Sequence, residues 1–428
     1  MKIIFTKKLI ILFIIIYFII TPTVSLMLNN INAGEQQYSF LANSFLKLKT
    51  YFIDNTIFLP KAEYLSDVTF YEGKYYWPGG PFPAVILMLF VWLFGLFNLF
   101  FFQGYLQIFL IIFILYFCYL LAQRIGFAKY DAMFLTIAFY AASMFIGVAV
   151  RPWSWYFAQV VTVFLLLASF VEYYNKKRYW LIGIIFGLTA LTRITAGIGI
   201  VFFIMEILFF NKENKKIKKL AQLILPFIFI AGLIFPYNYI RFGNVFEQGY
   251  SKQIIGRPQH QIDYNENPLV KARNYGMLSA VHIPSNLYYS LLAAPIPIFK
   301  DNISHVLKFP FITSNPWGMS IFITSPYLIY LFFLKNKDKL SYLLFITAIS
   351  IAIPIFMYYG IGYVSFGYRY GLDFFPFLFI LFMRNYHYQY GQLSNKLKFL
   401  IILSGFINLY LYLGYNYNYL LINNYNLC

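Results

Sequence analysis

A polar stretch with reactive and aromatic side chains interrupts a chain that is otherwise largely apolar. Residues 66–83 have the sequence SDVTFYEGKYYWPGGPFP. The side chains in it that could do chemistry are Asp67, Lys74, Tyr75, Tyr76 and Trp77. A carboxylate can take a proton from a hydroxyl group, an ammonium can bind phosphate, and Gly73, Gly79 and Gly80 allow tight turns. These residue types predict a loop with a function of its own.

Arginines at three separate positions could bind an anion. They are Arg193 in LTALTRITAGI, Arg241 in YIRFGNVF and Arg369 in SFGYRYGLDFFPF. A guanidinium binds phosphate through two parallel hydrogen bonds. An arginine within apolar sequence is costly in a bilayer, so two short helices are expected to meet at Arg193 and bring it to the membrane surface. The alternative for Arg369 is an internal ion pair with Asp373, four residues later.

Composition defines the class of protein that must position these residues. The chain has 428 residues, of which 61% are hydrophobic and 11% are charged. This excess of apolar residues predicts an all-α polytopic membrane protein. The net charge of +18 comes from short basic clusters between apolar runs, which is typical of cytoplasmic loops and argues against a nucleic-acid partner. Cys118 and Cys428 form no disulfide framework and no metal-ligand spacing.

Apolar runs and basic loops together predict the topology. Runs occur near 9–28, 83–102, 104–122, 131–150, 155–173, 179–193, 195–210, 220–240, 318–334, 340–358, 368–383 and 398–420. If all of them crossed, the basic loops 175–178, 211–219 and 335–339 would lie outside, against the positive-inside rule. We therefore predict that 83–102, which opens with two prolines, is a re-entrant or interfacial helix. The alternative is that 83–102 crosses and another run does not.

The resulting architecture has about eleven transmembrane helices. The predicted divisions are 1–28, the first helix; 29–103, a first external loop with interfacial helices and the expected active site; 104–240, helices two to seven; 241–317, a second external stretch; and 318–428, the C-terminal helices. The first helix is expected to be retained, although its basic start and small-residue tail also fit a cleaved signal peptide. The three arginines and the loop 66–83 all fall on the external face.

Several stretches together resemble the GT-C glycosyltransferases. These stretches are GEQQYSFLANSFLKLKTYF, DVTFYEGKYYWPGGPFPAVILMLFVWLFG, FGLTALTRITAGIGI, PYNYIRFGNVFEQGY, GMSIFITSPYLIYLF and SFGYRYGLDFFPFL, from about residue 30 to 383. The family consists of polytopic enzymes that take sugars from polyprenyl-phosphate carriers. The bacterial members that transfer mannose to protein or aminoarabinose are the type that the chain resembles. The resemblance implies a membrane enzyme whose active site lies on the external, periplasmic face of the cytoplasmic membrane.

The resemblance also implies roles for individual residues. The first loop carries the acids Glu35, Asp54, Glu63, Asp67 and Glu72. Glu35 matches the family's catalytic base, with glutamate in place of the usual aspartate, and Asp67 is the second candidate. The substrate-binding candidates are Lys74, Tyr75, Tyr76, Trp77, Arg193, Arg241 and Arg369. Gln36 stands where a second acid is often found, so the pattern requires no metal and leaves a divalent cation as an open alternative.

The expected partners are a polyprenyl-phosphate sugar donor, the lipid bilayer and a glycan, lipid or protein acceptor. A lipid-linked donor is required because nucleotide sugars are not available outside the membrane. Such an enzyme needs a base for the acceptor hydroxyl and fixed cations for the departing phosphate. Attack from the face opposite the phosphate predicts inversion. Two alternatives stay open: a lipid-linked glycan polymerase or ligase, and a flippase or transporter for a lipid-linked sugar.

Overall fold

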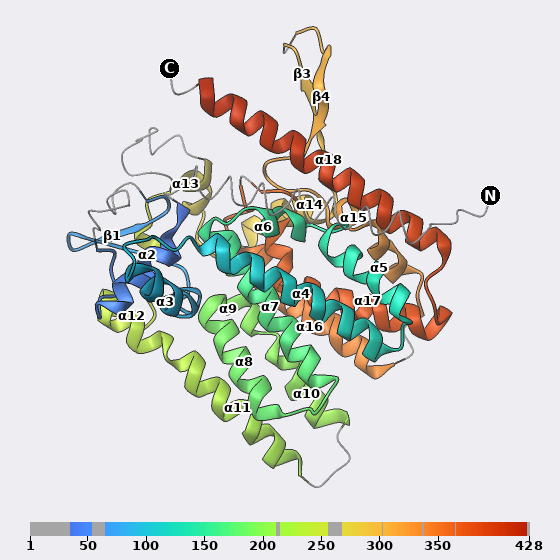
Figure 1. The fold of residues 1–428 in the computed structure, drawn as a ribbon, viewed down its shortest axis with the longest axis horizontal. Helices are drawn as coiled ribbons and strands as arrows, with labels where there is room; N and C mark the ends of the chain where they lie inside the picture. The colour runs from blue at the N-terminus through green and yellow to red at the C-terminus, as the bar shows by residue number, and fades with distance from the viewer. Residues whose placement is uncertain are drawn as a thin grey trace. The chain divides into compact units, whose positions relative to one another are not determined.

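A computed structural model describes most of the chain between Glu35 and Tyr425 (Figure 1). The described ranges are 35–53, 65–210, 215–255, 268–301, 303–335, 338–363 and 365–425, with side chains as far as Gly414. The predicted first helix, 9–28, lies outside these residues, as do the loop acids Asp54 and Glu63.

The described residues are mostly helical with little sheet, which is compatible with the predicted all-α membrane class. Five of their helices are long and apolar enough to cross a bilayer. These are α4 (Gln103–Ile125), α7 (Ser154–Tyr173), the continuous pair α11 (Lys216–Gly232) and α12 (Ile234–Phe242), α16 (Lys339–Met357), and the Asn395–Gly414 part of α18 (Asn395–Tyr425). The sequence runs at 104–122, 155–173, 220–240, 340–358 and 398–420 therefore form helices as expected.

The chain divides into two compact units, each built from two separate stretches of the sequence. Unit 1 takes the residues up to Ile114 together with Ala149–Lys271, and unit 2 takes Leu115–Val148 together with the residues from Ala272 onward. The remaining helices of unit 1 are α2 (Gln37–Leu46), α3 (Phe82–Gly95), α8 (Tyr179–Thr192), α9 (Ile194–Gly197) and α10 (Ile200–Phe210). A short 3-10 helix, Tyr250–Lys252, follows α12, and α13 (Pro268–Arg273) lies at the end of the unit.

The polar stretch of the first loop folds as a β-hairpin in unit 1. Strands β1 (Thr69–Tyr71) and β2 (Lys74–Tyr76) pair antiparallel, with Thr69 opposite Tyr76 and Tyr71 opposite Lys74. The turn residues Glu72 and Gly73 have φ of +48° and +72°. Positive φ at both positions is typical of the type I′ turn, whose twist suits a two-residue hairpin.

Helix α3 covers only part of the run 83–102, for which a re-entrant or interfacial helix is predicted. It contains 14 residues, which at about 1.5 Å per residue gives a length well short of the ~30 Å hydrocarbon core. Pro83 lies in its first turn, and no helix continues over residues 96–102. The helix packs against α2, so it belongs to the first-loop assembly.

Two short helices do meet at Arg193. Helix α8 ends at Thr192, Arg193 is extended with φ −146°, and α9 begins at Ile194. A methyl group added at Gly197 would lie 2.8 Å from the Cβ of Ala190. This close approach between residues seven apart shows that the chain folds back on itself here. Arg193 therefore lies at the tip of a helical hairpin.

The short elements of unit 2 correct the predicted uniform spans. The run 131–150 forms α5 (Lys129–Tyr140) and α6 (Phe145–Val150), while 318–334 forms α15 (Ile321–Thr324) and a 3-10 helix, Pro326–Phe332. Proline cannot continue a helix from the preceding turn, which explains the second break. Asn408 of α18 donates to the carbonyl oxygens of Ala141 (3.0 Å) and Thr324 (2.8 Å), one at each break. One side chain thus satisfies backbone groups that both interruptions leave.

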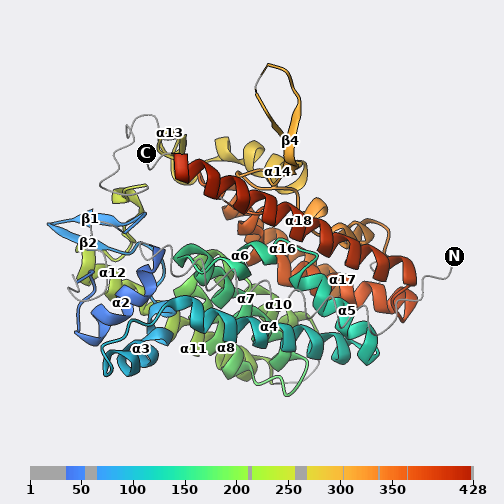
Figure 2. The ribbon, with the colours of Figure 1, turned by 45° about the horizontal axis from the view of Figure 1, so that its top comes forward.

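The other elements of unit 2 complete its helical core. They are α14 (Ile283–Leu291), β3 (Ile296–Phe299), β4 (Leu307–Thr313), a 3-10 helix Arg369–Asp373 and α17 (Phe375–Tyr390). Helices α16 and α17 pack together (Figure 2), and the hairpin of β3 and β4 stands out beside α18. Phe139 packs between Phe375 and Phe379, at ring distances of 5.4 and 5.1 Å. Aromatic packing therefore forms the interior of this unit.

Candidate active site

Asp67 is held by two segments that are distant in the sequence. Its carboxylate oxygen Oδ2 accepts a hydrogen bond from the Trp155 Nε1 (2.9 Å), in the first turn of α7. Its carbonyl oxygen accepts one from the Gln253 side chain, also at 2.9 Å. Asp67 has φ +56°, a left-handed conformation that aspartate tolerates better than most residues. The backbone and the carboxylate are therefore both fixed.

Aromatic rings pack together beside this carboxylate. Trp77 is fully buried, and its ring lies 4.5 Å from Trp155 and 5.5 Å from Tyr38 of α2. Burial raises the pKa of Tyr38 well above its ordinary value, although the nearby positive charge of Arg193 opposes the shift. The Tyr38 hydroxyl therefore stays protonated at any physiological pH. Rings of this kind can pack on the apolar face of a sugar.

Arg241 is buried against neutral groups. Its side chain is 3% exposed, and its Nη1 donates to the carbonyl oxygen of Trp77 at 2.8 Å. Its Nη2 donates to Asn238 Oδ1 at 2.6 Å, and the guanidinium lies 3.9 Å above the ring centre of Tyr237. Hydrogen bonds to a carbonyl and an amide satisfy donors without cancelling the charge. Arg241 therefore supplies a positive charge directly behind Trp77.

The Pro-Gly-Gly loop rests on the end of α8, directly before Arg193. A methyl group at Gly80 would lie 2.1 Å from the carbonyl oxygen of Leu191 and 2.6 Å from that of Thr192. Only glycine allows this approach. Arg193 is half-buried and close enough to Tyr38 to influence its ionisation. We name the assembly of Tyr38, Asp67, Trp77, Trp155, Arg193 and Arg241 the Asp67 cluster.

Glu35 is anchored at the same turn of α7. Its carbonyl oxygen accepts hydrogen bonds from Gln103 Nε2 and Ser154 Oγ, each at 3.1 Å. Gln103 Nε2 also donates to the Pro152 carbonyl oxygen at 2.6 Å. Ser154 directly precedes Trp155, the residue that holds the carboxylate of Asp67. The two candidate bases are therefore positioned by adjacent residues of one helix start.

Several residues that hold the starts of α2, α4 and α7 together were not predicted from the sequence. Gln36 Oε1 accepts from the backbone N–H of Gln103 (3.0 Å), and Gln107 donates to the Ala149 carbonyl oxygen (2.8 Å). Arg151 is 2% exposed and lies 4.4 Å above the Trp153 ring. Its position directly before an apolar run was the available signal. The glutamines and Ser154 are ordinary residues at helix starts, and only tertiary packing shows their role.

Three residues predicted to bind substrate lie in the hairpin. Lys74 is exposed beside the turn, with its Nζ 4.9 Å above the Tyr51 ring. Tyr75 packs on Phe70 at 4.9 Å. Tyr76 is buried against Phe242 at 5.1 Å. These contacts give Tyr76 a packing role and place Lys74 on the surface, whereas Trp77 is the member of this run that reaches the cluster.

Arg369 belongs to unit 2. It is 7% exposed and lies 4.7 Å above the Tyr370 ring. Its Nε lies 3.3 Å from the position that a Cβ would take at Gly362. A glycine thus makes room for this guanidinium. The buried, aromatic setting is similar in kind to that of Arg241.

Within the described ranges, no group of three histidine, cysteine, aspartate or glutamate side chains is arranged to hold a metal ion. The chain matches no family model, no characterised protein and no solved structure in the comparisons made. The contacts of the Asp67 cluster are therefore the basis for any functional conclusion.

Proposed function

We propose that this chain is an integral membrane glycosyltransferase of GT-C type. It would move a sugar from a polyprenyl-phosphate carrier to an acceptor hydroxyl at the external face of the cytoplasmic membrane. The observation that carries the proposal is the Asp67 cluster itself. A fixed carboxylate lies beside packed aromatic rings. Two arginines, Arg193 and Arg241, lie near the same rings. A base, a sugar platform and cations for phosphate are the parts that this reaction requires.

The contacts also support the predicted topology of about eleven helices. In that topology Glu35, Gln103 and Ser154 all lie at external helix ends, and the structure joins them by hydrogen bonds. At the ends predicted to be cytoplasmic, Arg178 pairs with Glu172 at 2.8 Å and Lys398 with Asp131 at 2.7 Å. Residues assigned to one face contact one another, as a consistent topology requires.

The proposed reaction is a single displacement at the anomeric carbon of the sugar. The base takes the proton of the acceptor hydroxyl, and the resulting oxygen forms the new bond to carbon. The bond from carbon to the phosphate oxygen breaks, and the lipid phosphate leaves with the electron pair. Arg193 and Arg241 would stabilise the charge that develops on that phosphate. Attack from the opposite face gives inversion.

Asp67 is the base that the contacts favour. The indole N–H of Trp155 donates to its carboxylate, and such a hydrogen bond stabilises the ionised form that a base needs. Two hydrogen bonds to its carbonyl oxygen hold the backbone of Glu35 at the same helix start. Glu35, which the family resemblance places first, is the alternative base. Trp155, which is half-buried, would pack against the sugar on the donor side, with the buried Trp77 ring behind it.

The test is sugar transfer by purified protein offered a panel of polyprenyl-phosphate sugars. Asp67→Asn keeps the hydrogen-bonding shape and the tolerance for left-handed backbone. It should lower turnover by about 100-fold or more, the usual contribution of a general base. Glu35→Gln should have a smaller effect. Glu72→Gln is the matched control, because Glu72 is an exposed carboxylate in the same loop.

The alternatives predict different results in the same assay. If turnover is lost in Glu35→Gln and kept in Asp67→Asn, the enzyme class stands and the base is Glu35. Transfer of whole glycan chains in place of single sugars would indicate the polymerase or ligase. Movement of a lipid-linked sugar across the bilayer without bond cleavage would indicate the flippase. Absence of turnover with every donor, in membranes that contain native acceptors, would contradict the proposal.

A further inference from the structure

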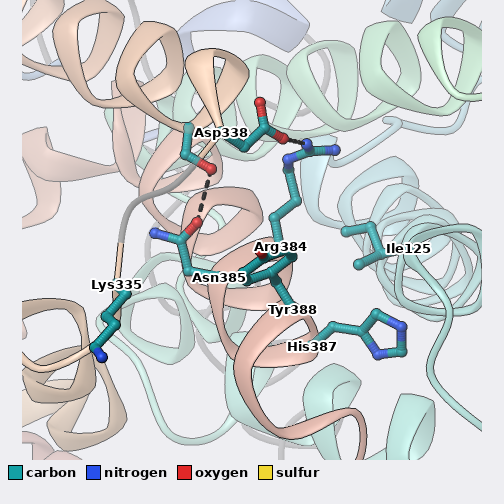
Figure 3. A pocket seen from close by; sticks show the side chains of 8 residues that line it. Ile125, Lys335, Asp338, Arg384, Asn385, His387 and Tyr388 are labelled. Carbon is teal, nitrogen blue, oxygen red and sulfur yellow. Dashed lines mark hydrogen bonds and ion pairs between the residues drawn. The ribbon is translucent and has the colours of Figure 1, made fainter.

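Unit 2 contains a small polar pocket where α4 ends, α16 begins and α17 ends (Figure 3). Its volume is about 180 Å³, and its lining residues are Ile125, Lys335, Asp338, Ser341, Arg384, Asn385, His387 and Tyr388. Sites for whole small molecules usually measure ~300–1,000 Å³. The pocket is therefore suited to a compact polar group and not to a complete cofactor.

Hydrogen-bond donors dominate the lining. Ser341 Oγ donates to Asn385 Oδ1 at 2.7 Å, which turns the amide nitrogen of Asn385 to the opposite side, where Figure 3 shows Lys335. Lys335 and Arg384 add an ammonium and a guanidinium, neither of which can accept a hydrogen bond. A ligand that accepts several hydrogen bonds and carries negative charge fits this set.

The carboxylate in the lining is already occupied. Asp338 forms an ion pair with Arg384, and its Oδ1 accepts from the backbone N–H of Leu340 (2.6 Å) as the N-cap of α16. The contact with Asp338 is made at Nη2 of Arg384. Asp338 thus orients Arg384 toward the pocket but does not supply a site for a cation.

Basic residues outnumber acidic residues at this end of unit 2, and two of them, Lys335 and Arg384, line the pocket. The basic residues are Arg124, Lys129, Lys335, Lys339, Arg384, Lys396 and Lys398, and the described acids there are Asp131 and Asp338. Both acids are in ion pairs, Asp131 with Lys398 at 2.7 Å and Asp338 with Arg384. The excess of positive charge therefore attracts anions to this end.

We infer that the pocket binds a phosphate group. Phosphate supplies several acceptor oxygens with negative charge, and arginine and lysine together are its usual partners. His387 forms a fixed wall, because its Nδ1 lies 2.6 Å from the Gly391 carbonyl oxygen and its ring packs on Phe127 at 4.9 Å. Two sources share this chemistry: the head group of an anionic phospholipid in the cytoplasmic leaflet, and free inorganic phosphate.

The experiment measures lipid binding by native mass spectrometry on the full-length protein in detergent. Short-chain phosphatidic acid and phosphatidylglycerol are titrated beside phosphatidylcholine, with and without millimolar inorganic phosphate. Lys335→Gln should weaken binding of the anionic lipids about fivefold, the effect of about one basic residue near an anionic surface. Lys129→Gln is the matched control, since Lys129 is exposed and removes the same charge without lining the pocket.

A double variant tests the pocket without leaving an unpaired charge that could destabilise the fold. Asp338→Asn with Arg384→Gln removes both partners of the ion pair, so no unpaired charge is left, and it should lose selective binding as well. Competition by inorganic phosphate would identify the free anion as the ligand, and resistance to it would identify the lipid. Equal losses in Lys335→Gln and Lys129→Gln, or equal binding of a fatty acid that lacks phosphate, would overturn the inference.

Discussion

Arg241 of unit 1 and Arg384 of unit 2 solve the burial of a guanidinium in two ways. Arg241 is 3% exposed and contacts the Trp77 carbonyl, the Asn238 amide and the Tyr237 ring. Arg384 is 21% exposed in its side chain and pairs with the carboxylate of Asp338. Neutral partners satisfy the donors and preserve the positive charge, whereas a carboxylate also cancels it.

Arg241 should attract an anion more strongly than Arg384 does. A preserved charge in a buried aromatic setting acts on an anion through a low effective dielectric, so its influence is large. At the pocket of unit 2, the charge of Arg384 is largely cancelled, and attraction depends on exposed lysines such as Lys335. Surface charges of that kind have modest effects that salt screens. We therefore expect strong phosphate stabilisation in the Asp67 cluster and weak, salt-sensitive binding in the pocket.

Gly80→Ala should cause the largest loss of turnover. The added methyl group would lie 2.1 Å from the Leu191 carbonyl oxygen, so the loop must leave the end of α8. Displacing a positioning element by about 1 Å can lower a rate about 100-fold, and we expect a loss of that size in sugar transfer. The measurement is turnover together with phospholipid binding, which should be unchanged in unit 2.

The matched control is Gly95→Ala at the end of α3, where an added methyl group meets nothing within 4 Å. It should leave turnover and thermal stability close to those of the natural chain. Normal turnover in Gly80→Ala would contradict the placement of the loop against α8.

Arg241 tests the value of the preserved charge. Arg241→Met should lower turnover about tenfold or more and destabilise the fold by roughly 1.5–3 kcal/mol, because the Trp77 carbonyl loses a charged hydrogen-bond donor. Arg241→Lys should recover part of the turnover, since it keeps the charge but not the planar fork. Thermal unfolding and initial rates measure the two effects. Unchanged turnover in Arg241→Met would show that the charge of Arg241 has no part in the reaction.

Sequence patterns predicted an all-α membrane protein, and the mostly helical structure with five long apolar helices is compatible with that class. The meeting of two helices at Arg193 was expected from the cost of charge in a bilayer, and an interrupted run at 83–102 from its two opening prolines. Those are local properties, so the sequence expresses them directly. Whether α3 crosses the bilayer stays a prediction. The assignment of Trp77 and Arg241 to one site followed from the external-face prediction, and the contact between them is present in unit 1.

The parts that sequence did not predict depend on contacts between distant residues. The breaks within 131–150 and 318–334 are stabilised by Asn408, far along the chain. Hydropathy does not register such a contact, because both runs are apolar on average. The roles of Ser154 and Trp155, which hold the two candidate bases, were not predicted for the same reason. Their residue types are ordinary, and their importance comes from tertiary contacts.

Asp338→Asn tests whether the carboxylate of Asp338 cancels the charge of Arg384 in unit 2. Asparagine caps a helix as well as aspartate does, so α16 should persist while the charge of Arg384 is released. We expect phosphate-dependent lipid binding to increase by a few-fold, at a cost of about 1 kcal/mol or less from the lost ion pair. Asp301→Asn is the control, since it removes the same charge from the exposed turn between β3 and β4. An equal gain in both variants would attribute the effect to net charge alone.

Lys74→Gln should have the smallest effect. The lysine is exposed and contacts the Tyr51 ring at 4.9 Å, and an exposed cation–ring contact contributes about 0.5–1 kcal/mol. If Lys74 stays on the surface during the reaction, turnover should change by about twofold or less, since the Asp67 cluster is untouched. A tenfold loss in turnover with unchanged thermal stability would mean that the hairpin closes over the donor phosphate. In that case Lys74 would join Arg193 and Arg241 as a third cation, and the preserved charges of unit 1 would include one that arrives only with substrate.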